Sequence, residues 1–239
     1  MSTRLGVNVD HIATLRNARG EGHPDPVIYA KKVMNFGADS ITIHLREDRR
    51  HIKDKDLARF LKQKKIPINL EMAANKEMLS IALKYKPNFV CIVPEKRNEI
   101  TTEGGLNLKK NKDIITKVLN KLNSEKIRTS LFINPSIKDV YASKNFNANC
   151  VELHTGKFAT KVKNKANHMQ ELNKIKKCAI LANKLGIEVH AGHGLDYKST
   201  KILKKIKFIE EFNIGHFIIG ESIMSGMKNV IKKFKKIIY

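Results

Sequence analysis

The sequence predicts an α/β protein, a closed (β/α)8 TIM barrel that forms a single domain over residues 1–239. Patterns of strand and helix alternate along the whole chain, which is typical of parallel sheets. Eight such units occur, and eight strands are what closes a barrel of this size. No linker or break in composition divides the chain, so one domain is expected.

Each predicted strand is a short apolar run, rich in β-branched residues, that follows a turn signal. Gly37 and Asp39 mark the turn before the second strand, and Gly186 precedes the seventh. The predicted strands are Leu5–Asp10, Ile41–Leu45, Ile68–Met72, Phe89–Val93, Thr129–Ile133, Cys150–His154, Glu188–His193 and His216–Gly220.

Between these strands, apolar residues recur at helical spacing. Asp25 is suited to cap the first helix, and Pro26 to occupy its first turn. The predicted helices are Pro26–Phe36, Asp54–Leu61, Lys76–Leu83, Lys112–Leu122, Ile137–Ser143, His168–Leu185, Tyr197–Ile206 and Ser222–Ile238. A doubly wound open sheet is the second choice, but it would carry a Gly-rich turn after the first strand, and none follows here.

The chain is strongly basic, with a formal net charge of +23. Such a charge is found in nucleic-acid-binding proteins. Here the lysines are spread over predicted helices such as Lys201–Lys207, and the aromatic residues, 6% of the chain, do not alternate with them as a stacking platform requires. We therefore favour a solvated surface that attracts anionic small molecules, and keep a nucleic-acid-binding protein as an alternative.

The sequence indicates neither a membrane protein nor a secreted one. No apolar run is long enough to span a bilayer, and MSTRLGVNVDH leads into a strand rather than a signal peptide. Cys91, Cys150 and Cys178 are odd in number and lack metal-ligand spacing, and no Gly-rich nucleotide loop follows a strand. We expect a cytoplasmic protein with no metal and no organic cofactor.

Imidazole and carboxylate groups gather where the predicted strands end. Six of the nine histidines lie there: His11, His44, His154, His190, His193 and His216. The other polar residues at these positions are Asn8, Asp10, Glu71 and Glu152. Because the C-terminal strand ends form the active-site face of a barrel, we expect these side chains around one mouth. Glu71 has a second interpretation, an anion at the start of the following helix.

Three loops are candidates for binding or closing over a ligand. Ser40–Ile52 runs from a strand into three arginines, which bind phosphate in a bidentate manner, so it predicts a phosphate-binding loop; a solvated basic loop is the alternative. Gly192–Leu195 and Asn213–His216 follow or overlap the last two strands, where barrels often hold a phosphate. Pro94–Leu106 is either a lid or a flexible connection.

Seven segments, in order, closely resemble the pyridoxine 5′-phosphate synthase family of deoxyxylulose-dependent vitamin B6 biosynthesis. They are GVNVDHIATLRNARG, ITIHLREDRRHI, NLEMA, VPEKRNEITTEGGL, ELHTG, AGHGL and NIGHFIIG, within Leu5 to about Gly226. The resemblance implies a (β/α)8 barrel that assembles as a homo-octamer without metal or organic cofactor. It also implies a transferase-class condensation of 1-deoxy-D-xylulose 5-phosphate with 3-amino-2-oxopropyl phosphate, which closes a pyridine ring and releases phosphate and water.

The family motifs imply roles for single residues. His44 and Glu71 would accept protons and His193 would donate one. Glu152 would stabilise charged intermediates. The residues implied to hold 1-deoxy-D-xylulose 5-phosphate are Asp10, His11, Arg46, His51 and Thr101. Those implied to hold 3-amino-2-oxopropyl phosphate are Asn8, Arg19, Gly194, Gly215 and His216.

Two positions depart from the family pattern. His190 stands where relatives carry a smaller polar residue, and Glu221 where they carry a basic one. From the residues alone, a different enzyme class also stays open, an epimerase or isomerase that acts on one sugar phosphate. Such an enzyme needs one phosphate pocket, so a second anion site distinguishes the two.

Overall fold

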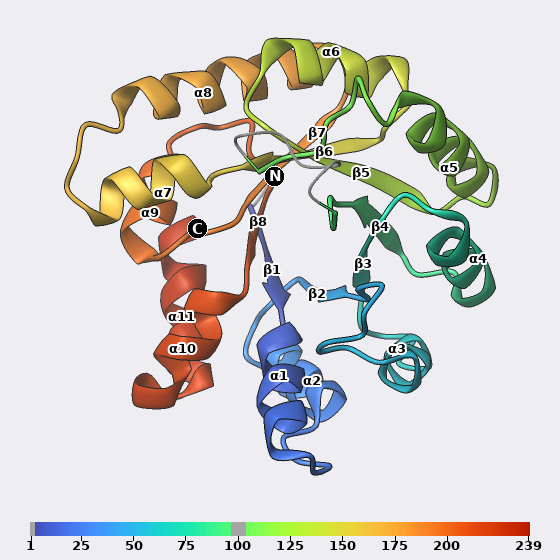
Figure 1. The fold of residues 1–239 in the computed structure, drawn as a ribbon. Helices are drawn as coiled ribbons and strands as arrows, with labels where there is room; N and C mark the ends of the chain where they lie inside the picture. The colour runs from blue at the N-terminus through green and yellow to red at the C-terminus, as the bar shows by residue number, and fades with distance from the viewer. Residues whose placement is uncertain (1–2, 97–103) are drawn as a thin grey trace.

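A computed structural model describes residues 3–96 and 104–239, and Figure 1 shows the fold. Eight parallel strands close into a barrel in which each strand pairs with its neighbour in sequence and β8 returns to β1. Helices surround this barrel on the outside (Figure 1). The predicted (β/α)8 barrel is confirmed.

Seven of the predicted strands lie within two residues of their predicted ends. The strands are β1 (Arg4–Asn8), β2 (Ser40–His44), β3 (Ile68–Met72), β4 (Phe89–Ile92), β5 (Arg128–Ile133), β6 (Cys150–His154), β7 (Glu188–Gly192) and β8 (Glu211–Ile214).

The eighth predicted strand is wrong, because His216–Gly220 lies in helix α10 (His216–Ser225). The apolar run there supplies the buried residues of that helix, Ile218 and Ile219. The real β8 has the sequence EFNI, which offers only two apolar residues. Its Glu211 and Asn213 alternate with them, since successive strand side chains point to opposite faces.

The described residues form three more helices than predicted, α1, α7 and α10. The run Asp10–Arg19 was predicted as a strand end and a loop, but it forms α1. The helices are α1 (Asp10–Arg19), α2 (Pro26–Asn35), α3 (Asp54–Leu61), α4 (Lys76–Tyr85), α5 (Lys112–Ser124), α6 (Ile137–Asn145), α7 (Gly156–Lys163), α8 (Met169–Lys184), α9 (Tyr197–Leu203), α10 and α11 (Met227–Ile238). No helix in the described part of the chain is both long and apolar enough to cross a membrane.

The main hydrophobic core lies between the strands and the helices. One face of each strand supplies fully buried apolar side chains, such as Leu5 and Val7 of β1 and Ile41 and Ile43 of β2. The other face is largely polar and points into the barrel. Hydrogen bonds and ion pairs that skip a strand demonstrate this, since Arg4 of β1 reaches Glu188 of β7 across β8. Polar side chains therefore fill much of the barrel interior, from its N-terminal end to its mouth.

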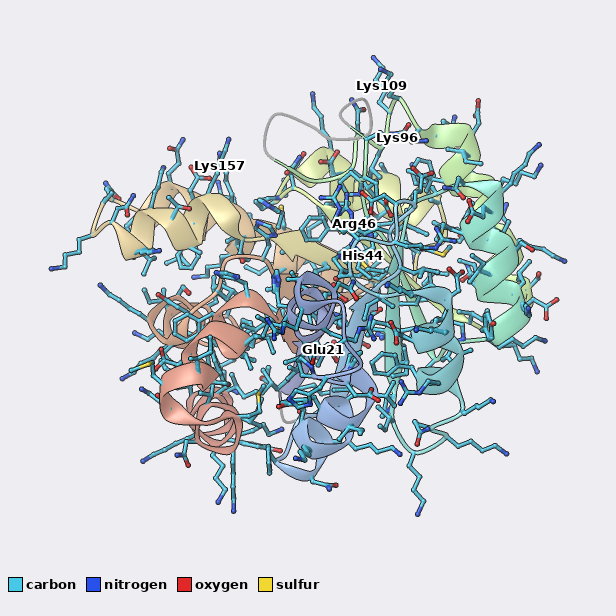
Figure 2. All side chains as sticks on the ribbon, turned by 60° about the horizontal axis from the view of Figure 1, so that its bottom comes forward. Glu21, His44, Arg46, Lys96, Lys109 and Lys157 are labelled. Atoms are coloured by element: carbon cyan, nitrogen blue, oxygen red, sulfur yellow. The ribbon has the colours of Figure 1, made fainter. Side chains whose placement is uncertain are left out.

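The lysines are distributed as the sequence suggested. Their side chains project outward from helices all around the molecule rather than from one face (Figure 2). A protein that binds nucleic acid by its charge needs a contiguous basic stripe along the phosphate backbone. The arrangement therefore favours a solvated surface.

Candidate active site at the barrel mouth

The first strand end is organised around Asp10. Asn8 donates from Nδ2 to Asp10 Oδ2 at 2.8 Å, and the Asp10 amide donates to Asn8 Oδ1 at 2.9 Å. Asp10 Oδ1 in turn accepts from the backbone amide of His44 at 2.9 Å, which ties β1 to β2. Burial raises the pKa of Asp10 to about 6, against the lowering effect of His44, Asn8 and Arg46. Asp10 thus positions two other predicted site residues, Asn8 and His44.

His44 lies between two carboxylates. Its Nε2 is 2.9 Å from Oε1 of Glu95, and its Nδ1 is 3.8 Å from Oε2 of Glu71. Glu95 also accepts from the amide of Glu47, so it joins the loop after β2 to the loop after β4. Burial, Glu152 and Asp10 raise the pKa of Glu71, while the pKa of Glu95 is lowered by His44 despite its burial. The three side chains lie in a row, with a hydrogen bond between His44 and Glu95 and a gap of 3.8 Å between His44 and Glu71.

His51 and Arg46 face the same region from the loop after β2. The His51 Nδ1 accepts from the Ile52 amide at 2.9 Å, and its ring lies 5.9 Å from the ring of His44. Burial, together with His44 and Arg46, lowers the pKa of His51 to about 4. His51 is therefore neutral near pH 7, with Nε2 as its N–H donor. Figure 2 shows His44 and Arg46 together near the centre of the molecule.

Arg16 of α1 connects the His51 loop to helix α3. Its two terminal nitrogens donate to both oxygens of the fully buried Asp56 at 2.7 and 2.8 Å. The same guanidinium donates to the backbone carbonyl of His51 at 3.3 Å, and Asn17 donates there at 2.8 Å. Helices α1 and α3 and the His51 loop are thus connected by one bidentate ion pair.

Glu152 is buried on β6, inside the barrel. Asn213 donates from Nδ2 to Glu152 Oε2 at 2.8 Å. The other oxygen lies against β7 at Gly192, where a Cβ atom would be only 2.0 Å from Glu152 Oε1. Glycine is therefore required at this position for the carboxylate to fit. Burial raises the pKa of Glu152 to about 7, although His190 and Asn213 lower it.

His193 follows β7 and reaches the mouth beside His154. The two rings stack with their centroids 4.7 Å apart. The His193 backbone has a φ of 78°, an uncommon value for a residue other than glycine, and the Gly194 φ is 77°. Thr155 Oγ1 lies 2.7 Å from the carbonyl oxygens of both Gly192 and His193. Part of the His193 residue is exposed to solvent, but its ring is largely surrounded by protein. This partial burial lowers the pKa of His193.

Gly215 and His216 mark the end of β8 and the start of α10. A Cβ at Gly215 would lie 2.8 Å from the Cβ of Asn8, so the two strand ends approach closely there. His216 contacts His11 with ring centroids 5.2 Å apart, and burial and His216 lower the pKa of His11. Helix α10 therefore starts at the end of the barrel that carries Asn8, and the first turn of a helix suits an anion site.

The structure brings together most, but not all, of the predicted site residues. Those at the mouth are Asn8, Asp10, His11, His44, Arg46, His51, Glu71, Glu152, His193, Gly194, Gly215 and His216. Arg19 is not among them, because it ends α1 with its side chain 77% exposed and paired with Glu21. Thr101 lies outside the described residues. Sequence reasoning missed Glu95 and Asn213; Glu95 stands in the motif VPEKRNEITTEGGL, which is the signal that identifies it.

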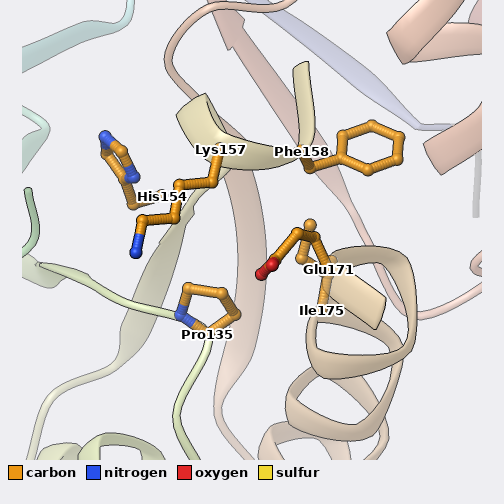
Figure 3. A pocket seen from close by; sticks show the side chains of 6 residues that line it. All are labelled: Pro135, His154, Lys157, Phe158, Glu171 and Ile175. Carbon is orange, nitrogen blue, oxygen red and sulfur yellow. The ribbon is translucent and has the colours of Figure 1, made fainter. Parts of the chain in front are cut away.

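A small pocket lies beside the mouth of the barrel. It lies between β6, α7 and α8, as Figure 3 shows, and is lined by Pro135, His154, Lys157, Phe158, Glu171 and Ile175. The stacking of His154 on His193 connects it to a predicted catalytic residue. Its Glu171 is paired with Lys161 and Lys174.

The mouth also contains a set of potential metal ligands. Asp10, His44 and Glu71 offer donor atoms that all lie within 4.8 Å of one another. Arg46 supplies a positive charge near Asp10 and Glu71. The Asp10 carboxylate is already engaged by hydrogen bonds from Asn8 and His44.

Comparisons with known proteins identify the family of the chain. The model of the family described as pyridoxal phosphate biosynthesis protein PdxJ matches residues 5–239. Pyridoxine 5′-phosphate synthase of Pelagibacter ubique is 62% identical over 234 residues, which cover 98% of this chain and 98% of that protein. The enzyme of the same name from Zymomonas mobilis is 51% identical over 232 residues, covering 97% of this chain and 90% of that one.

Solved structures show the fold alone. Orotidine 5′-monophosphate decarboxylase from Methanocaldococcus jannaschii aligns with a TM-score of 0.68 at 11% identity, over 100% of this chain and 99% of that one. N-(5′-phosphoribosyl)anthranilate isomerase from Pyrococcus furiosus aligns with a TM-score of 0.60 at 12% identity, over 98% of each chain. The family match and the two highly identical relatives carry the assignment: the chain belongs to the PdxJ family of pyridoxal phosphate biosynthesis proteins.

Proposed function

We propose that the chain makes pyridoxine 5′-phosphate at the mouth of the barrel, by condensing 1-deoxy-D-xylulose 5-phosphate with 3-amino-2-oxopropyl phosphate. The observation that carries the proposal is the His44 ring placed between Glu95 and Glu71, in a chain 62% identical to a pyridoxine 5′-phosphate synthase. The alternative, an isomerase, needs only one phosphate pocket. It therefore does not explain the second set of anion-binding groups at Gly194, Gly215 and His216.

The reaction needs several proton transfers, and the mouth supplies groups for them. Joining the amine to the ketone releases water, and the later loss of phosphate and closure of the ring remove protons from carbon. Glu71 and His44 accept these protons, and Glu95 on the far ring nitrogen of His44 extends the path. His193 donates a proton from the opposite side of the mouth. Glu152, buried beneath, balances positive charge that develops on the substrate nitrogen.

The phosphate of 1-deoxy-D-xylulose 5-phosphate is held by Arg46 and His51. The Nε of Arg46 is buried and has no hydrogen-bond acceptor among the described residues. A buried donor without an acceptor is costly, and a phosphate oxygen satisfies it. The neutral His51 adds an Nε2–H donor. Asp10, tied to both His44 and Asn8, accepts from a substrate hydroxyl in the same region.

Replacing Arg46 by lysine tests this placement. We expect Arg46→Lys to raise the KM for 1-deoxy-D-xylulose 5-phosphate by about tenfold or more, because lysine keeps the charge but lacks the fork that binds two phosphate oxygens. The KM for the amino-ketone should change much less. Steady-state kinetics with each substrate varied in turn measures both, and an unchanged kcat/KM for the deoxyxylulose phosphate contradicts the assignment.

The phosphate of 3-amino-2-oxopropyl phosphate is held by backbone amides at Gly194, Gly215 and His216, with Asn8 beside them. The positive φ of Gly194 and the first turn of α10 present amides that are free to bind an anion. Arg19 completes this site only if its exposed side chain leaves Glu21 and turns toward the mouth.

The reaction itself is tested without any cofactor. The purified chain is incubated with both substrates and an excess of EDTA, which removes metal ions. It should still form pyridoxine 5′-phosphate and release phosphate at an undiminished rate. Chromatography measures the pyridoxine 5′-phosphate, and a phosphate assay measures the released phosphate. Absence of product with and without metal argues against the proposed function, whereas loss with EDTA that Mg²⁺ or Zn²⁺ restores argues only against the cofactor-free mechanism.

We further propose that the chain acts in the cytoplasm as a homo-octamer. Its three cysteines are free and buried, as suits a reducing compartment. Ile223 and Met224 of α10 are 75% and 89% exposed, and Leu15 of the neighbouring α1 is 50% exposed, so apolar side chains remain for another copy to cover. Light scattering on a size-exclusion column should give eight times the 27.2 kDa chain mass, and a monomer at micromolar concentration would exclude the octamer.

A further inference from the structure

The barrel interior below Glu152 holds a charged cluster that the proposed reaction does not use. His190 on β7 is at its centre and is nearly fully buried, with 7% of its side chain exposed. The titratable groups that face it come from four other strands as well as its own: Arg4, Arg128, Cys150, Glu152, Glu188 and Glu211. Four of these are charged ion-pair partners at the N-terminal end of the barrel.

The contacts of His190 favour its protonated form. Its Nε2 lies 2.8 Å from Glu188 Oε1, and its Nδ1 lies 3.9 Å from Glu211 Oε1. Burial alone would lower the pKa of His190, but Cys150, Glu211 and Glu188 together raise it well above its ordinary value. A buried imidazolium with a carboxylate facing each ring nitrogen is the form that satisfies both carboxylates.

A metal ion is a poorer explanation of the same cluster. Cys150, Glu188 and His190 do place donor atoms within 4.8 Å of one another. However, Arg4 and Arg128 pair with the two different oxygens of Glu188, and the Arg4 guanidinium is 3.2 Å from His190 Nε2. A divalent cation there would face two guanidiniums at contact distance. The ion pairs, rather than a metal, account for the cluster.

Counting charges connects His190 to Glu152. The guanidiniums of Arg4 and Arg128 balance the carboxylates of Glu188 and Glu211. With His190 protonated, the cluster therefore carries one net positive charge, and this charge acts on the Glu152 carboxylate. The two residues are paired in register on the adjacent strands β6 and β7. Both point into the barrel, since residues level with each other on parallel strands share a face.

We propose that His190 is a positioning residue for Glu152: held between Glu188 and Glu211, its imidazolium supplies the buried positive charge that keeps the Glu152 carboxylate ionised beneath the reacting substrates. The inference rests on the proposed role of Glu152 in stabilising cationic intermediates. His190 touches no substrate itself. Its charge acts through the low-dielectric interior of the barrel, where a neighbouring charge has a strong effect on ionisation.

The test is the pH dependence of kcat in His190→Gln, which removes the charge and keeps an amide of similar reach. Activity of the native protein should rise with pH as Glu152 ionises, near its pKa of about 7. In His190→Gln we expect this acid limb to move up by about one pH unit or more, the effect of removing a unit charge beside a buried carboxylate. Turnover at pH 7 should then fall roughly fivefold or more and recover by about pH 9.

Two further variants make the result decisive. Glu211→Gln removes a carboxylate that opposes ionisation of Glu152 while leaving His190 paired with Glu188, so its acid limb should move to lower pH. It also serves if His190→Gln fails to fold. His168→Gln, the same substitution on the outside of the barrel, should leave the profile unchanged. An acid limb that stays in place in His190→Gln, or moves up in Glu211→Gln, overturns the proposal. A native protein that forms no product would instead refute the proposed function.

Discussion

Glu71→Gln should lose about 10²- to 10⁴-fold in turnover while the protein becomes no less stable, because a positioned general base contributes in this range. Glutamine fills the same space beside His44 Nδ1 but cannot accept a proton. Glu71 is 17% exposed at its side chain, so the substitution leaves the packing of β3 intact. Steady-state kinetics at saturating substrate measures the loss.

The stability of Glu71→Gln relative to the native protein should increase with pH. Burial, Glu152 and Asp10 raise the pKa of Glu71 in the folded chain. A carboxyl whose pKa is raised on folding stabilises the fold fully below its unfolded pKa, about 4.3, and loses that contribution as the pH rises through the folded value. Glutamine does not titrate, so its contribution to stability does not change with pH. The melting temperature of Glu71→Gln should therefore exceed that of the native protein by more at pH 8 than at pH 5.

Glu77→Gln is the matched control for Glu71. Glu77 lies in the next helix, 60% exposed and paired with Arg49 at the surface, so its loss should leave turnover within about twofold because surface ion pairs contribute little. A Glu71→Gln protein with near-native turnover would remove Glu71 from the proton path. A Glu71→Gln protein that melts at a markedly lower temperature at both pH values would show that the carboxylate is needed for folding.

The barrel could be predicted from the sequence because each strand had one apolar face and a turn before it. The exception, β8, shows the limit of that pattern. Its inward residues, Glu211 and Asn213, are polar because the barrel interior is polar, and with four residues the strand has too few apolar positions to stand out. The apolar run that was taken for it, in α10, is buried against other helices and strands, and such a short run fits either structure.

The mouth was predictable for the residues that end strands, since topology alone brings those ends together. His44, Glu71 and His193 are examples. Contacts that depend on side-chain reach were not predictable: Glu95 comes to His44 from 51 positions further along the chain, and Asn213 reaches Glu152 from β8. Arg19, assigned by motif, ends a helix with its side chain exposed and paired with Glu21, so its role stays a prediction. The spacing of apolar residues in the sequence predicts where the strands and helices lie. The hydrogen-bond partners of a side chain depend on how these elements pack, which the spacing does not give.

His193→Asn should retain its fold and both substrates but lose about 10²- to 10⁴-fold in turnover, the contribution typical of a positioned general acid. Asparagine donates a hydrogen bond from a side chain of similar shape, but it cannot deliver a proton near pH 7. The His193 ring is desolvated beside His154, and its lowered pKa leaves it neutral in the free site. We expect it to gain its proton when the negative substrate phosphates enter the mouth, since opposite charge nearby raises the pKa of histidine.

The backbone makes asparagine the right substitution for this test. His193 has a φ of 78°, and asparagine adopts such left-handed conformations more readily than most residues other than glycine. The loop before Gly194 should therefore keep its shape, and the melting temperature should not fall. Single-turnover experiments should show a reaction intermediate that accumulates, because the steps before the proton donation are unaffected.

The alternative role for His193 is to hold the loop after β7 through its stacking on His154. In that case His193→Asn would lower the melting temperature and weaken substrate binding together, while turnover at saturation stayed near the native rate. His168→Asn, a histidine at the start of α8 far along the chain from the mouth loops, controls for the loss of an imidazole as such and should change none of the three measurements. Because the two roles predict opposite outcomes for turnover and stability, measuring both on one variant decides whether His193 is the proton donor.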